Sequence, residues 1–159
     1  MTALRAAARR SSLSGAAVAA CALVVLASST PVRAATNPYA RVPVAGDSVR
    51  FDASHAGEKQ AWAYPNLNYL EAFLRSAIDA FYSTMSYEEY QKKMSLVLSK
   101  SLALDNGTVG VVQHVQTFVY RNHEDVEVEV QVQSGALGHS VVWTTPAELV
   151  DSSGRSYLH

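Results

Sequence analysis

The chain has 159 residues, room for one domain, and its 48% apolar and 17% charged residues argue against both disorder and a multispan membrane protein. All 14 acidic residues lie at or after Asp47. Four of the 13 basic residues lie before residue 35, so the remaining chain carries 9 basic against 14 acidic residues, a net charge of −5. A domain this acidic is repelled by phosphate backbones and anionic lipid, which argues against nucleic acid as a partner.

The first 34 residues follow the three-part pattern of a cleavable signal peptide. A short basic start precedes an uncharged apolar run over residues 13–27. A polar stretch follows, in which Val32 and Ala34 stand where signal peptidase requires small side chains. We expect cleavage after Ala34 and export to the bacterial periplasm or secretion. The alternatives are a targeting leader for an organelle lumen, thylakoid or mitochondrial, and an uncleaved membrane anchor, although a span needs roughly 20 apolar residues.

The only cysteine of the chain, Cys21, lies inside this leader. A mature chain without it has no disulfide, no thiolate metal ligand and no cysteine nucleophile. We therefore expect the mature domain to be held together by its hydrophobic core alone.

Residues 35–65 are expected to form an extended N-terminal arm with one short strand at residues 49–51. The apolar residues of this segment show no sustained period. Trp62 and Tyr64 are the expected anchors of the arm, either on the domain or on a partner. Five helix- and strand-breaking residues interrupt the segment: Pro38, Pro43, Gly46, Gly57 and Pro65.

The α+β domain is expected to span residues 66–159 and to begin with two helices. Apolar residues recur at three and four positions over residues 68–84, where Asn68 and Glu71 suggest a capped start. A second helix is expected over residues 86–104, because Ser86 and Glu89 form a capping-box pattern. The short connection predicts a helical hairpin.

The remaining chain is predicted to form a four- to five-stranded antiparallel meander. Strands are expected at residues 109–120, 126–133 and 140–145, followed by a last hairpin over residues 148–158. In residues 126–133 valine alternates with Glu or Gln, so the valines should face the core and the polar set should face water. This element order resembles cystatin-like and nuclear-transport-factor-like cones, and also periplasmic scaffold domains of type IV secretion machines.

The sequence contains no recognisable catalytic or metal-binding constellation. The five histidines do not stand at the spacing of metal ligands, and neither a nucleophile elbow nor a phosphate-binding glycine loop is present. Glu127 and Glu129 share one strand face and could act as paired carboxylates, but an alternating Val/Glu strand usually has one dry and one wet face. We expect no catalytic residue, metal or cofactor.

Two functions remain from different classes. The first is a non-enzymatic interaction or assembly subunit in an exported complex, which would dock a protein partner through aromatic side chains and the exposed edge of the sheet. The alternative is a small-ligand-binding cone with a pocket between helices and sheet, and less favoured still is a small hydrolase or isomerase. The interface candidates are Trp62, Tyr64, Tyr82, Tyr87 and Tyr90. The pocket candidates are His114, Tyr120 and Trp143.

Overall fold

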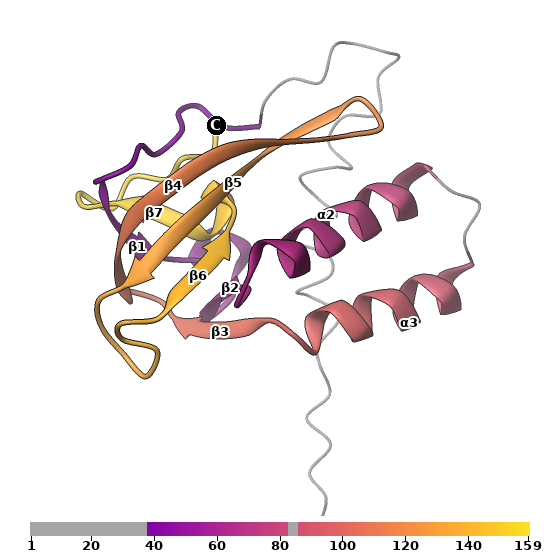
Figure 1. The fold of residues 1–159 in the computed structure, drawn as a ribbon, viewed down its shortest axis with the longest axis horizontal. Coiled ribbons are helices and arrows are strands. Elements are labelled where there is room, and N and C mark those ends of the chain that lie inside the picture. Colours follow the sequence, from indigo (N-terminus) through magenta and orange to yellow (C-terminus); the bar gives the residue numbers. More distant parts are fainter. Residues whose placement is uncertain (1–37, 83–85) are drawn as a thin grey trace, which may run out of the picture.

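The protein is described by a computed structural model over residues 38–82 and 86–159. In these ranges it is an α+β fold with two α-helices, a five-stranded sheet and a two-stranded sheet (Figure 1). The predicted leader, its cleavage site and the expected end of the first helix at Thr84 lie outside the described residues.

The larger sheet is antiparallel and has the strand order β6-β5-β4-β1-β7. Strands β4 and β5 form a long hairpin, because both residues of its turn, Arg121 and Asn122, have positive φ angles of 49° and 65°. Such a two-residue turn has a twist that matches its flanking strands. The strands are β1 (Ser48–Phe51), β4 (Val109–Tyr120), β5 (His123–Val132), β6 (Val141–Thr144) and β7 (Leu149–Asp151).

The segment expected to be an irregular arm is largely built into the fold. The strand predicted at residues 49–51 exists as β1, but it lies inside the sheet, between β4 and β7. Residues 60–63 form a second strand, β2 (Gln60–Ala63), which pairs with β3 (Leu102–Asp105). Strands β1 and β2 are each only four residues long, and their partners lie far along the chain. No local pattern in the sequence therefore indicates these pairings. The sheet is therefore not a simple meander, since its N-terminal strand is inserted between later ones.

The two helices begin at hydrogen-bonded caps. Helix α2 (Leu67–Tyr82) starts one residue earlier than expected, and its cap is Asn66 rather than Asn68: the Asn66 carboxamide oxygen accepts from the Tyr69 N–H at 3.2 Å. Helix α3 (Tyr87–Leu98) has the predicted capping box of Ser86 and Glu89. The two helices pack against each other.

Helix α3 ends earlier than the apolar periodicity indicated. Residues 102–104 had been expected to continue it, but they leave the helix after a turn at residues 99–101 and form β3. Leu104 is buried there in the core. A leucine at helical spacing also fits a strand when apolar and polar residues alternate around it. Here the pairing with β2 decides between helix and strand.

Two hydrophobic clusters lie on opposite sides of the larger sheet. The first contains the four alternating valines of β5, which are buried as predicted. The second lies where α2 covers the sheet and contains Leu70, Leu74, Ile78 and Phe118. Because α2 covers part of the second face, the prediction that the Glu/Gln set of β5 faces water is wrong at one position: Glu127 is only 1% exposed.

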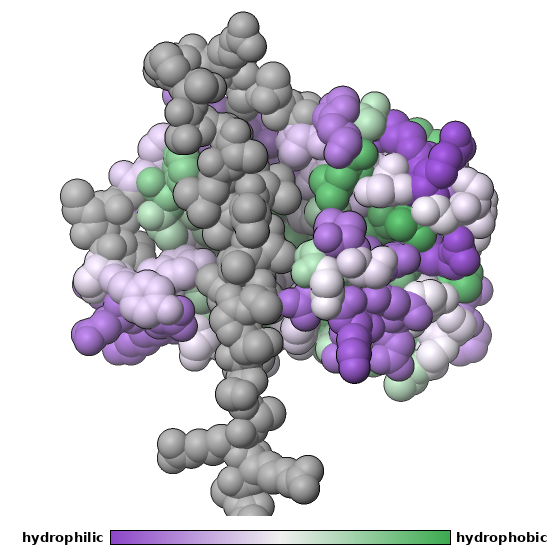
Figure 2. Space-filling view, turned by 180° about the vertical axis from the view of Figure 1, so that it is seen from behind, coloured by the Kyte–Doolittle hydropathy of each residue, from purple (hydrophilic) through white to green (hydrophobic). Residues whose placement is uncertain are grey.

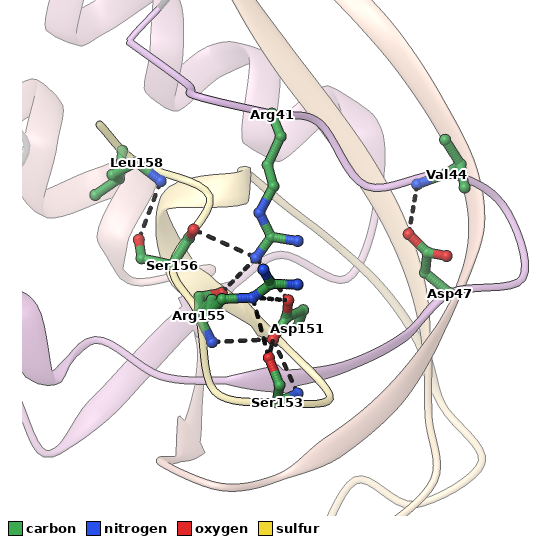
Figure 3. Close-up of polar contacts among 8 residues, drawn as sticks. All are labelled: Arg41, Val44, Asp47, Asp151, Ser153, Arg155, Ser156 and Leu158. Atoms are coloured by element: carbon green, nitrogen blue, oxygen red, sulfur yellow. Dashed lines mark hydrogen bonds and ion pairs between the residues drawn. The ribbon is translucent and has the colours of Figure 1, made fainter.

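The C-terminal residues hold the segment that enters β1 (Figure 3). Arg41 pairs with Asp151 at 2.9 Å and donates to the main-chain oxygen of Arg155 at 2.7 Å. Its guanidinium also lies 4.3 Å from the ring centre of Tyr157. The Ala40 N–H donates to the Tyr157 main-chain oxygen, and Tyr39 forms a β-bridge with Leu158, so residues 38–41 are fixed against the chain after β7.

Candidate ligand-binding pocket

A partly open pocket of about 60 Å³ lies where the helices meet β2 and the short 3-10 helix η2 (Pro146–Glu148). Its lining comes from segments that are distant in the sequence: β2, the two helices, and η2 with the residues before it. Most of the lining side chains are apolar or aromatic, which is typical of small-molecule sites. The lining residues are Trp62, Tyr64, Leu70, Phe73, Met94, Leu98, Thr144, Thr145, Ala147 and Glu148.

Glu148 is the one charged residue in this lining. Its Oε2 atom accepts a hydrogen bond from the main-chain N–H of Trp62 at 2.8 Å. Burial raises the pKa of the Glu148 carboxyl to about 7; the Trp62 N–H opposes this rise and the nearby negative charge of Glu58 adds to it. Glu148 can therefore change its charge near neutral pH, a property that is common in functional sites.

Trp62 connects the pocket to the rest of the sheet. Its main-chain oxygen accepts from the Thr144 hydroxyl at 2.9 Å, and its indole Nε1 is buried with no hydrogen-bond partner among the described residues. A buried donor without a partner is uncommon in folded proteins. The wall of the pocket thus combines an aromatic ring, an unpaired donor and an ionisable acid.

Helix α3 closes one side of the pocket, although little of the helix is buried. Met94 is its one fully buried residue, and both Met94 and Leu98 line the pocket. In Figure 1 the helix lies beside α2 and away from the larger sheet. The shape of the pocket therefore depends on the attachment of α3 to α2.

The three residues predicted to line a pocket share the helix-facing side of the sheet but lie outside this pocket lining, and only His114 and Trp143 are neighbours, since Tyr120 stands at the far end of β4. The rings of His114 and Trp143 are 6.3 Å apart, and His114 is exposed. Tyr120 donates to Asp79 of α2 at 3.0 Å. The Tyr120–Asp79 hydrogen bond joins α2 to β4, whereas the His114–Trp143 contact lies within the sheet.

The five residues proposed as an interface separate into two groups. Trp62 and Tyr64 line the pocket, and Tyr64 forms main-chain hydrogen bonds with Trp143 along the outer edge of β6. Tyr82 and Tyr87 lie at the far ends of α2 and α3, where they are 52% and 74% exposed. Tyr90 is half-buried on α3.

Sequence reasoning missed the role of Glu148. The available signal was a single acid inside the short apolar segment from Pro146 to Val150, because an acid in such a context is either exposed at an edge or buried with a partner. Here the partner is a main-chain N–H of a strand that was not expected to be there.

Glu127 and Glu129 lie on the same strand face, as predicted, but they differ in environment. Glu127 is buried and accepts from the Gln116 side chain at 2.8 Å, while its Oε1 atom has no partner in the described part of the chain. Glu129 is half-buried. Within residues 38–82 and 86–159, no group of three or more His, Cys, Asp or Glu side chains is arranged to hold a metal ion.

The comparisons with known proteins do not assign a family. No protein-family model, curated protein or solved structure matches this chain. Neither α2 nor α3, the two α-helices in the described ranges, is long and apolar enough to cross a membrane.

Proposed function

We propose that this protein is an exported, non-enzymatic binding domain that takes a small ligand, or the end of a larger one, into the pocket lined by Trp62 and Glu148. The pocket is the observation that carries this proposal, since it combines an apolar lining with one half-buried acid. Export rests on the leader pattern of the sequence. In this proposal α2 and α3 act as a helical hairpin that covers the ligand.

Ligand binding is favoured over docking by a free arm or a free sheet edge. Residues 38–41 are held by the C-terminal segment, and β1 is paired on both sides. The outer edge of β6 is bonded to Tyr64, and that of β7 is bridged by Ser156. A partner that adds a strand would have to displace these contacts.

The proposal can be tested with a substitution that fills the pocket. Ala147→Leu adds three carbon atoms to the lining, whereas Ala103→Leu adds the same atoms to an exposed position on β3. Protein purified without denaturation from its native compartment should carry a small molecule, detected by mass spectrometry, in the wild type and A103L but not in A147L. Equal occupancy in all three, or none in the wild type, would contradict the proposal.

A second candidate function is that of an assembly subunit. Phe81, Tyr82 and Tyr87 are 42%, 52% and 74% exposed at the far ends of the helices, and aromatic residues are enriched at protein interfaces. Seen from behind the view of Figure 1, the visible hydrophobic surface lies in small separate areas (Figure 2). Affinity purification from the native compartment tests this: a stoichiometric complex that Y87A loses supports it, and a monomer excludes it.

A further inference from the structure

We infer that the pocket selects a cationic amine, a ligand with a protonated nitrogen and a short apolar body. This inference rests on the proposed ligand-binding function and names the class of ligand. It is carried by the charge, the aromatic walls and the size of the pocket.

The charge in and around the pocket is negative and not neutralised by the protein. None of the four ion pairs found in the described ranges involves Glu148. The charge that acts on Glu148 is that of Glu58, another acid. The other ionisable residue in the pocket lining is Tyr64. An ammonium group would give Glu148 the opposite charge it lacks, while an anion would be repelled by both acids.

The walls beside Glu148 are aromatic. Trp62, Tyr64 and Phe73 line the pocket, and the rings of Tyr64 and Phe73 are 5.6 Å apart with a 32° angle between their planes. The negative faces of such rings attract ammonium groups. Aromatic rings with a neighbouring carboxylate therefore suit a ligand that is both positively charged and partly apolar.

The size of the pocket limits the ligand. A cavity of about 150 Å³ holds the six carbon atoms of benzene, so about 60 Å³ has room for roughly two or three non-hydrogen atoms, and the rest of a longer ligand must extend through the open side. We therefore expect the pocket to hold a small amine or the amine end of a longer molecule.

The test compares three probes of equal length: propylammonium, 1-propanol and propionate. Each is titrated into the ¹⁵N-labelled full-length chain, and the chemical shift of the Trp62 main-chain amide, which donates to Glu148, reports binding. 1-Propanol also offers an acceptor to the indole N–H of Trp62, so it separates an effect of that donor from an effect of the Glu148 charge. At pH 8 we expect propylammonium to bind about tenfold more tightly than 1-propanol, and propionate to bind least.

The pH dependence gives a second measurement on the wild type alone. Glu148 changes from mostly neutral at pH 6 to mostly ionised at pH 8, whereas propylammonium stays charged at both values. Its apparent affinity should therefore rise about tenfold from pH 6 to pH 8, in proportion to the ionised fraction of Glu148. The affinity for 1-propanol should not rise.

The variant Glu148→Gln keeps an acceptor for the Trp62 N–H and removes the charge, so it should lose the preference for the amine. Glu124→Gln removes an exposed acid at the end of β5 and should behave as the wild type. Equal binding of propylammonium and 1-propanol at pH 8, or a preference that E148Q retains, would overturn the inference. If 1-propanol saturates the pocket without any amine preference, the binding function stands and the ligand class is wrong; if no probe shifts the pocket amides, both fail.

Discussion

The main-chain N–H of Trp62 and the Oε2 atom of Glu148 are 2.8 Å apart, and this hydrogen bond joins β2 to η2 across 86 residues of sequence. It places an acid with a pKa of about 7 in a wall of the pocket. Because desolvation at this position raises the pKa of Glu148, while the Trp62 hydrogen bond opposes the rise, the stability of the fold should depend on pH.

The first prediction concerns that dependence. The folded pKa of Glu148 lies above the ordinary value of 4.5, so its contribution to stability is fully present below pH 4.5 and is lost as the pH rises through about 7. The difference in the free energy of unfolding between the wild type and E148Q should shift by about 3 kcal/mol against the wild type between pH 4.5 and pH 8. Urea denaturation at both pH values measures this, with E124Q as the control. A constant difference would exclude a raised pKa of Glu148.

The second prediction concerns Glu127. Burial raises its pKa, and its Oε2 atom accepts from Gln116. In Glu127→Gln the new amide oxygen can still accept from Gln116 and no charge is buried, so the variant should be more stable than the wild type at pH 8 by about 1 kcal/mol. Its half-buried neighbour on the same face provides the control Glu129→Gln. A loss of stability at pH 8 that is specific to E127Q would show that the carboxylate is needed in the fold.

The third prediction links a helix cap to the pocket. In Ser86→Ala the capping box of α3 is lost, which should cost about 1 kcal/mol and loosen the helix that supplies Met94 and Leu98. Both the urea midpoint and the affinity for a pocket ligand should fall. Ser95→Ala, at an exposed position inside the same helix, should leave both unchanged. Normal binding by S86A would indicate that the pocket does not depend on the start of α3.

The fourth prediction concerns the contact between residues 38–41 and the C-terminal segment. Arg41→Ala removes the ion pair with Asp151 and the hydrogen bond to the Arg155 oxygen. Hydrogen exchange of the Ala40 amide, which bonds to Tyr157, should become about tenfold faster, while the amides of β4 and β5 keep their rates. Arg155→Ala removes only an exposed side chain from Asp151 and should have a smaller effect. Equal exchange rates at Ala40 in all three proteins would show that the main-chain bonds suffice.

The parts of the fold with a local cause could be predicted from the sequence. The start of α3 follows from Ser86 and Glu89, and the hairpin of β4 and β5 follows from a β-branched and aromatic run, a polar turn and an alternating run. The α+β class follows from these elements. The insertion of β1 between β4 and β7 could not be predicted, because neither partner lies near it in the chain.

The candidate site was less accessible to sequence reasoning. Trp62 and Tyr64 were singled out as anchors, and both line the pocket. Glu148 was not, because its hydrogen bond and partial burial depend on β2, and β2 depends on β3 in a segment expected to be helical. The burial of Glu127 likewise results from α2 crossing the sheet, which no single strand pattern records.

The position of β1 has a consequence for how the chain reaches this structure during synthesis. Strand β1 ends at Phe51, but one of its neighbours begins at Val109 and the other at Leu149. A chain that emerges N-terminus first therefore carries β1 without a partner until Val109 has followed, and with one side unpaired until Leu149 has followed. Pairing over such distances closes large loops and is intrinsically slow, which would keep the polypeptide open while it is still being made.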